Sequence, residues 1–106
     1  MPAPTRMETL RQMLQKEPND GFCLYGIAQE FAKADQLEEA VVWFEKVLAV
    51  EPLHGYAAFH MAKALDRLGR TPQAIAMLHQ GIHAASQSGD TKALNELRGF
   101  LDELTP

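Results

Sequence analysis

The chain has 106 residues, of which 46% are hydrophobic and 23% are charged, and its formal net charge at pH 7 is −4. This composition is that of one ordered domain and excludes a disordered or low-complexity chain. The acidic balance argues against a nucleic-acid partner, because phosphate binding needs a basic field. No apolar run approaches the roughly 20 residues that span a bilayer, so no membrane partner is expected.

The cysteine content and the first residues bear on the cellular compartment. Cys23 is the single cysteine and has no partner for an internal disulfide, which agrees with a reducing compartment. Residues 1–6 lack the apolar stretch of a secretory signal. We therefore expect a cytoplasmic location.

Three helices are predicted in the first half of the chain, over about residues 6–16, 21–33 and 35–52. Thr5 and Glu8 have the spacing of a capping box at the start of the first helix. Asp20 is the expected N-cap of the second helix. Asp35, with Glu38 three residues later, is expected to start the third.

Three more helices are predicted in the second half, over about residues 55–68, 72–85 and 91–104. Gly69 suits a left-handed position after the first of them. Thr71 is the expected N-cap of the next, followed by Pro72 at the first helical position. Residues 86–90 are expected to form a polar turn. Because β-branched residues are few and period-two alternation is absent, the predicted fold class is all-α.

A self-match at a spacing of 34 positions, which we call the repeat period, runs from Gly21 to about Ala85. The matched pairs include Phe22 with Tyr56, Tyr25 with Phe59, Ala28 with Ala62, Ala40 with Ala74 and Phe44 with Leu78. A fixed period of this size is typical of a solenoid built from one repeated helical unit. Since solenoids usually act as binding surfaces, the repeat favours binding over catalysis.

The two units resemble the tetratricopeptide repeat, a 34-residue helix–turn–helix whose pattern begins Trp, two residues, Leu-Gly, two residues, Tyr. The pattern positions hold Leu24, Ile27, Ala28, Phe31, Ala40, Phe44 and Pro52 in the first unit. They hold Ala58, Met61, Ala62, Leu65, Ala74 and Leu78 in the second. The leading Trp is missing from both units. Ser86 stands where proline closes the pattern, and Gly81 takes a place held by Val47.

The resemblance implies a right-handed solenoid of antiparallel helix pairs, with about six helices in a single domain over residues 1–106. The expected parts are an N-terminal half repeat (5–17), repeat one (21–54), repeat two (55–88) and a C-terminal capping helix (90–104). The apolar stripe of the capping helix, which includes Leu94, Leu97 and Leu101, departs from the period by about two residues. We expect a slip in the preceding turn, so that the stripe covers the end of the stack.

In this family, partners usually lie in a concave groove lined by the first helix of each unit. The resemblance therefore implies a protein or peptide partner. The implied groove residues are Phe22, Tyr25, Gln29, Lys33, Tyr56, Phe59, His60, Lys63 and Arg67. The opposite helices carry several glutamates, so a segregation of charge is expected.

Lys63 and Arg67 lie one helical turn apart, within reach of a single carboxylate. They resemble half of the carboxylate clamp with which some family members hold a C-terminal acidic peptide. Gln29 stands where that clamp has asparagine, and Tyr25 where it has lysine. Two other interpretations stay open. One is a looser preference for acidic or aromatic peptides, and the other is simple pairing of the two cations with Asp66 or solvent.

The exposure of the aromatic residues is open at this point. A stripe of Phe and Tyr on a helix is either core or binding surface, and the first helix is in a position to cover Phe22 and Tyr25. Trp43 faces away from the expected core stripe. It either packs at the edge of the core or, with Met77 beside it, forms a dimer contact or a second binding patch.

Catalytic and metal-binding patterns are scarce. His79 and His83 have the i, i+4 spacing of a helical zinc site, but Gln80 stands where a zinc protease has glutamate. Cys23 lies near a helix start without a convincing histidine partner. Phosphate-binding glycine loops, dinucleotide fingerprints and serine nucleophile elbows are absent. No enzymatic activity, cofactor or metal is therefore predicted.

The predicted function is that of a non-enzymatic adaptor, which binds a peptide or protein segment in its concave groove. The alternative is a structural or assembly role, in which the terminal helices or the Trp43 face make a homodimer and no peptide is bound. A third interpretation is a regulatory subunit of a larger enzyme. The chain is accordingly expected to be a monomer or a weak homodimer.

Overall fold

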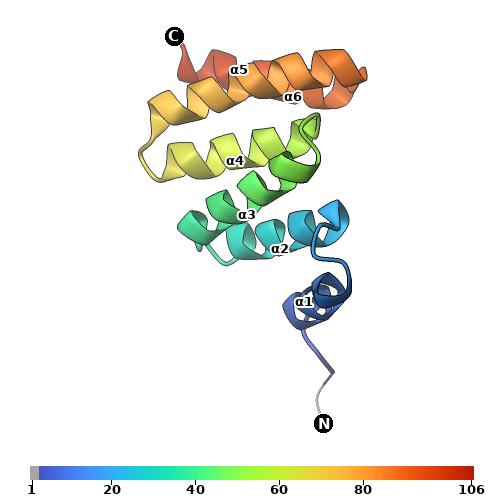
Figure 1. Ribbon diagram of the computed structural model, residues 1–106. Coiled ribbons are helices and arrows are strands. Elements are labelled where there is room, and N and C mark those ends of the chain that lie inside the picture. Colours follow the sequence, from blue (N-terminus) through green and yellow to red (C-terminus); the bar gives the residue numbers. More distant parts are fainter. Residues whose placement is uncertain (1–2) are drawn as a thin grey trace.

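The computed structural model describes residues 3–106, which form six α-helices and no strand. The helices are α1 (Arg6–Lys16), α2 (Gly21–Lys33), α3 (Leu37–Val50), α4 (Gly55–Arg67), α5 (Thr71–Ser88) and α6 (Thr91–Leu104). Each helix packs on the next, and α6 also packs on α4. The stack is elongated, 52 × 28 × 19 Å, with α1 at one end and α5 and α6 at the other (Figure 1). The predicted all-α helical solenoid is confirmed.

The core repeats the small and large residues of the pattern. Ala28, Ala40, Ala62 and Ala74 are fully buried, which lets paired helices approach closely. The largest fully buried side chains are Phe44, Ile27, Leu78, Leu97, Val47 and Cys23. Burial of each large apolar side chain contributes about 1.5–3 kcal/mol. The repeated sequence pattern therefore corresponds to the packing that holds the stack together.

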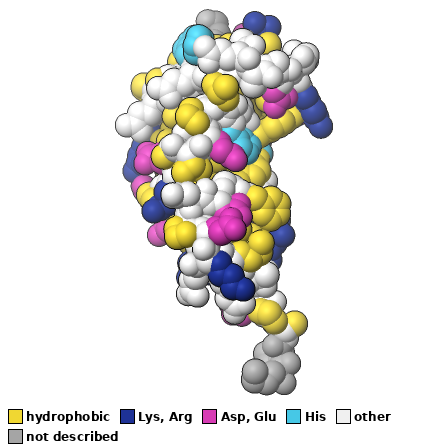
Figure 2. Space-filling model, turned by 45° about the vertical axis from the view of Figure 1, so that its right-hand side comes forward, with side chains coloured by type: hydrophobic (Ala, Val, Ile, Leu, Met, Phe, Trp, Pro, Cys, Tyr) yellow, Lys and Arg dark blue, Asp and Glu magenta, His cyan; other side chains and the backbone are white. Residues whose placement is uncertain are grey.

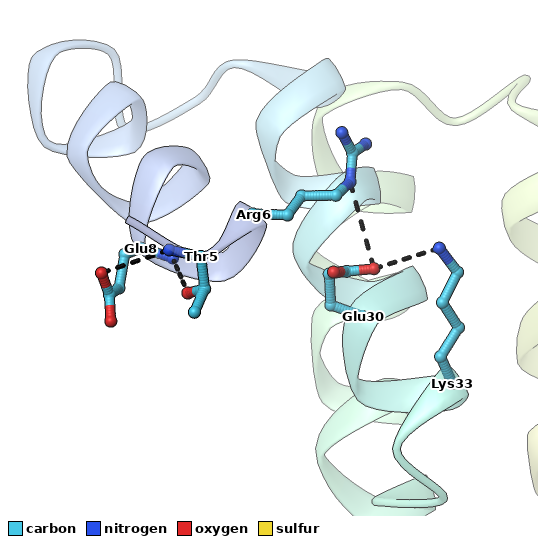
Figure 3. Close-up of polar contacts among 5 residues, drawn as sticks. All are labelled: Thr5, Arg6, Glu8, Glu30 and Lys33. Atoms are coloured by element: carbon cyan, nitrogen blue, oxygen red, sulfur yellow. Dashed lines mark hydrogen bonds and ion pairs between the residues drawn. The ribbon is translucent and has the colours of Figure 1, made fainter. Parts of the chain in front are cut away.

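The N-terminal helix α1 is fixed at both its cap and its contact with α2 (Figure 3). The Thr5 hydroxyl accepts from the Glu8 N–H at 3.1 Å, and the Glu8 carboxylate accepts from the Thr5 N–H, so the predicted capping box is confirmed. On α2, Glu30 Oε2 lies 4.0 Å from Arg6 Nε and 3.2 Å from Lys33 Nζ. This carboxylate links the two helices at the edge of the stack.

The start of α3 differs from the prediction. Asp35 does not start this helix but has φ 58°, a left-handed conformation, and closes α2. The Gln36 N–H donates to the Phe31 carbonyl at 2.9 Å, as in a Schellman motif. Gly69, one repeat period later, has φ 79° in the same place after α4. The prediction that Asp35 starts the third helix is therefore wrong, because an aspartate tolerates the left-handed turn that glycine makes in the second unit.

The bounds of α5 also differ at both ends. Thr71 is inside the helix rather than its N-cap, and its hydroxyl donates to Asp66 Oδ1 at 2.8 Å. At the other end α5 continues to Ser88, so most of the predicted polar turn over residues 86–90 is helical. The reason is Ser86: a proline there would stop the helix, and serine does not. Gly89 ends the helix with φ 75°.

The last helix follows the predicted slip. The helix α4 begins at Gly55, so a strict repeat period would start α6 at Gly89. It starts instead two positions later, at Thr91. Ala93 and Leu97 are fully buried, and the remaining apolar residues of the stripe are half-buried. The apolar stripe of α6 therefore lies against α5 and α4.

Candidate functional site

A pocket of about 300 Å³ opens between α2, α3 and α4. We call it the basic pocket, and it is lined by Gln29, Ala32, Lys33, Leu37, Phe44, His60, Lys63, Ala64 and Arg67. Five of the nine sequence-predicted groove residues lie here: Gln29, Lys33, His60, Lys63 and Arg67. Phe44 forms part of its apolar wall. A cavity with an apolar wall and several cations suits a ligand with both apolar and anionic groups.

Three more of the predicted residues form an aromatic row beside this pocket. The Tyr25 ring lies 6.2 Å from that of His60, Phe59 lies 5.2 Å from His60, and Tyr56 lies 6.4 Å from Phe59. All four rings are partly exposed. In Figure 2, hydrophobic side chains and histidine gather on one side of the molecule, about midway along its length. His60 belongs to both the row and the basic pocket, so the two regions are continuous.

Phe22 is separate from this arrangement. Its side chain is 65% exposed, the largest exposure among the large hydrophobic residues described. Neither the aromatic row nor the basic pocket includes it. The first helix therefore leaves most of the Phe22 side chain uncovered.

Two residues of the row were missed from the sequence. His54 is the N-cap of α4, where its Nδ1 accepts from the Ala57 N–H at 3.1 Å and its ring lies 4.6 Å from that of Tyr25. The sequence did indicate the capping role of His54, because this residue stands one repeat period after the N-cap Asp20. Phe100 of α6 extends the row, 6.1 Å from Phe59. It was missed because the slip of α6 removes it from the repeat period.

The three cations of the basic pocket differ in their partners. Lys33 pairs with Glu30, and Arg67 Nη2 lies 2.8 Å from Asp35 Oδ1. Lys63 pairs with no carboxylate in residues 3–106. Its Nζ instead lies 5.3 Å from the centroid of the Phe59 ring. Lys63 is therefore a cation beside aromatic rings without an acidic partner in the described structure.

The suggested pairing of Lys63 or Arg67 with Asp66 is wrong. Asp66 accepts a hydrogen bond from the Thr71 hydroxyl at 2.8 Å, and Arg67 reaches back to Asp35 in the first unit. A second ion pair, between Arg70 and Glu38, joins the same two units. Both pairs are exposed, where an ion pair contributes about 0–1 kcal/mol.

Burial favours the neutral forms of three rings in the row, those of His60, Tyr25 and Tyr56. Burial lowers the pKa of His60, and Lys63 and His54 lower it further, while Glu96 opposes them. Burial also raises the pKa of Tyr25 and of Tyr56. At neutral pH the rings of Tyr25, Tyr56 and His60 thus form an uncharged surface next to the Lys63 ammonium group.

Other sequence candidates lie outside this site. His79 and His83 are exposed on α5. Within residues 3–106, no three His, Cys, Asp or Glu side chains are placed to hold a metal ion. Cys23 is fully buried, and burial raises the pKa of its thiol, with Asp20 adding to the effect, so the thiolate is disfavoured. Trp43 is half-buried against Phe31, with ring centroids 6.3 Å apart.

None of the described helices is long and apolar enough to cross a bilayer.

A family model described as tetratricopeptide repeat matches residues 31–96, more than half of the chain. The chain belongs to the tetratricopeptide repeat family. Its members are generally non-enzymatic scaffolds for protein–protein interaction. The fold of this chain is therefore that of a protein-interaction module.

Several solved structures are similar to this chain. A tetratricopeptide repeat domain protein from Salinibacter ruber is 34% identical, with a TM-score of 0.75 over 80% of this chain and 94% of that one. A protein from Bordetella parapertussis is 24% identical, with a TM-score of 0.83 over 96% and 89%. MamA is 13% identical, with a TM-score of 0.70 over 92% and 64%. The last two show likeness of fold alone. No curated protein matches the chain.

Proposed function

We propose that this tetratricopeptide repeat protein is a non-enzymatic adaptor that binds a segment of a partner protein in the groove formed by α2 and α4. The segment carries an acidic side chain next to an aromatic one. The observation that carries the proposal is Lys63, which lies beside the aromatic row and pairs with no carboxylate in the described residues. A ligand carboxylate supplies that partner, and the ligand ring packs on Tyr25, Phe59 and His60.

The site favours a looser acidic and aromatic preference over a complete carboxylate clamp. Tyr25 stands where the clamp has lysine, and its ring packs against His54 and His60. Arg67 is already paired with Asp35. The groove thus offers one unpaired cation and several rings. Because only two repeats contribute, a free peptide buries little area and binds with modest affinity.

The test uses an acetylated twelve-residue peptide of alternating aspartate and phenylalanine, titrated into the ¹⁵N-labelled protein. We expect saturable amide shifts in α2 and α4, and binding at least about tenfold weaker in Lys63→Glu, since this replaces an attraction by a repulsion. The matched control is Lys92→Glu, the same charge change on the exposed surface of α6. Equal weakening by the two variants would argue against a site at Lys63.

A pull-down from the native lysate extends this test to natural partners. We expect the double variant Lys63→Glu, Arg67→Glu to lose proteins that the unaltered chain and Lys92→Glu both retain. If mass spectrometry identifies the same proteins with all three, the basic pair does not determine partner choice.

Homodimerisation is the second candidate, favoured by the 65% exposure of Phe22. Sedimentation at micromolar concentration separates it from the adaptor role. A single species of 11.8 kDa excludes the dimer. A dimer that Phe22→Ser abolishes, combined with no peptide binding, replaces the adaptor proposal.

We also propose that residues 5–17 act as a half repeat, 21–54 and 55–88 as full repeats and 90–104 as a cap, within one cytoplasmic domain. In support, the starts of α2 and α4 are separated by one repeat period, and so are the starts of α3 and α5. The same period separates the ends of α1 and α3, Lys16 and Val50.

A further inference from the structure

A second groove, larger than the basic pocket, lies between α1 and α3. It has a volume of about 620 Å³, against about 300 Å³ for the basic pocket. We call it the α1–α3 groove. Its lining residues are Arg11, Leu14, Gln15, Pro18, Asn19, Leu24, Trp43, Lys46, Ala49 and Val50. None of them belongs to the proposed peptide site, so the groove has a separate location in the fold.

The repeat provides an internal comparison for this groove. The hollow between α3 and α5 is lined by Leu48, Pro52, Ala58, Met77, Gln80, Gly81 and Ala84. Six of these lie one repeat period after Leu14, Pro18, Leu24, Trp43, Lys46 and Val50 of the α1–α3 groove. The equivalent hollow has only about 170 Å³. The size and the aromatic lining are thus specific to the α1–α3 groove and do not follow from the solenoid alone.

Trp43 provides a fixed apolar surface in this groove. It is half-buried and stacks on Phe31 of α2, with an angle of 29° between the rings. Lys46 Nζ lies 5.1 Å from the centroid of the Trp43 ring. Because both contacts restrict the indole, a ligand that packs on it needs little further ordering of the ring. The equivalent residue in the second unit is Met77, which is flexible and has no ring.

The charge of the groove is one-sided. Arg11 on α1 and Lys46 on α3 are its charged lining residues, and neither pairs with a carboxylate in residues 3–106. The residues one repeat period later are Glu45 and Gln80, so neither cation is repeated at the equivalent positions. An apolar groove with two unpaired cations, in a chain of net charge −4, is complementary to a ligand with apolar and acidic side chains.

We propose that the α1–α3 groove is a second docking site, which takes an acidic peptide segment of a partner protein. A leucine-sized or phenylalanine-sized side chain of the segment packs on Trp43, and flanking carboxylates face Arg11 and Lys46. The site is independent of the groove formed by α2 and α4. The chain would then hold two segments at once, from one partner or from two.

The experiment uses Trp43 as the reporter, because it is the single tryptophan of the chain. The probe is an acetylated and amidated twelve-residue peptide, Glu-Glu-Leu-Leu in three copies, which contains no aromatic residue. We expect a saturable change in Trp43 emission and no saturable change with the same peptide built from lysine and leucine. Arg11→Glu and Lys46→Glu should each weaken binding about tenfold or more. Both residues are exposed, and circular dichroism verifies that the variants fold.

Two controls separate this site from general charge and from the proposed peptide groove. Lys92→Glu makes the same charge change on α6, and Lys63→Glu makes it in the basic pocket; both should change the affinity less than about threefold. Amide shifts of the labelled protein should concentrate in α1 and α3. Shifts confined to α2 and α4, with loss of binding in Lys63→Glu, would overturn the second site and retain the first.

Three further outcomes would overturn the proposal. One is the absence of any saturable Trp43 response to the glutamate and leucine peptide. Another is equal weakening by Lys46→Glu and Lys92→Glu. The last is a concentration-dependent dimer in sedimentation that Trp43→Ala abolishes, because a second copy of the chain would then occupy the groove.

Discussion

In the first repeat, α2 meets α1 at Gly26, where an added Cβ would lie 3.0 Å from a Leu10 methyl group. One repeat period later the equivalent residues are His60 on α4 and Phe44 on α3, whose rings lie 6.1 Å apart. The same backbone position therefore serves close helix contact in one repeat and carries a ring of the candidate site in the other. The repeat period thus predicts where a residue lies in its helix. The neighbouring helix determines whether the side chain there is a packing contact or part of a surface.

Two further pairs at the same spacing differ in the same way. Val47 fills the core of the first repeat, whereas Gly81 lets α4 and α6 approach α5, because its Cβ would lie 2.8 Å from Ala58 and Leu97. Asp35 and Gly69 both end a helix in the left-handed region, but only aspartate adds a carboxylate for Arg67. The two repeats thus have the same helix arrangement but different side chains at equivalent positions.

The largest expected effect on stability comes from replacing Gly81 with valine, the residue at the equivalent position of the first repeat (Val47). Gly81→Val forces two methyl groups into atoms of Ala58 and Leu97 that lie against the helix. We expect the free energy of unfolding to fall by about 1–3 kcal/mol, as is typical of overpacked cores. Urea denaturation followed by circular dichroism measures the change.

The matched control is Gly99→Val on α6, where an added Cβ meets no atom within 4 Å. This variant should change the unfolding free energy by less than about 0.5 kcal/mol. If Gly81→Val is as stable as Gly99→Val, close approach at Gly81 is not what distinguishes the second repeat.

The next effect concerns His60, the residue that replaces Gly26. Its pKa in the folded chain is lowered, so the unfolded chain binds more protons as the pH falls below the ordinary histidine value of about 6.5. The stabilisation from neutral His60 is complete above that value. It is lost progressively as the pH drops through the lower, folded-state pKa.

Thermal unfolding between pH 8 and pH 5 tests this expectation. His60→Gln should reduce the loss of stability on acidification, whereas His83→Gln, the same change at an exposed position of α5, should not. The environment of His60 includes Lys63, Glu96 and His54. An identical pH profile in the unaltered chain and His60→Gln would show that other groups cause the loss.

The smallest effect concerns Asp35. Asp35→Asn keeps a side chain that tolerates the left-handed turn but removes the charge that holds Arg67. We expect stability to change by less than about 1 kcal/mol, because the ion pair is exposed. The released guanidinium should bind the aspartate and phenylalanine peptide about two- to fivefold more tightly, as measured by calorimetry. Asp102→Asn on α6 removes the same charge elsewhere and should leave the affinity unchanged; equal tightening in both would make the effect one of net charge.

Much of the fold could be predicted because local signals agree with the packing. The bounds of α1 and α6 follow from Thr5 and from the Leu97 stripe, and the slip of α6 was visible in that stripe. Asp35 was assigned to the wrong side of a turn because aspartate suits both an N-cap and a left-handed residue. At the end of α5, the replacement of the closing proline by Ser86 allows the helix to continue to Ser88, past the predicted end at about residue 85.

The site was predictable only in outline. The resemblance to the tetratricopeptide repeat implied that Gln29, Lys33, His60, Lys63 and Arg67 share one groove, and all five line the basic pocket. The sequence could not predict which cation lacks an acidic partner. The pairing of Lys33 with Glu30 depends on side-chain rotamers, and the pairing of Arg67 with Asp35 depends on the turn at Asp35. His54 and Phe100 were hidden by a capping role and by the slip of α6.

The turn that ends α2 also affects the ligand specificity that we expect of the proposed site. Because Asp35 is part of the chain, its carboxylate competes for Arg67 at a fixed effective concentration, of the order that short tethers reach, about millimolar. A single free carboxylate at micromolar concentration seldom displaces it. A ligand bound at Lys63 and on the aromatic row, as we propose, would compete from a similarly tethered position. We therefore expect Asp35 to compete for Arg67 with the ligand of the proposed site, so that a ligand contacts Arg67 only when the rest of it is in place.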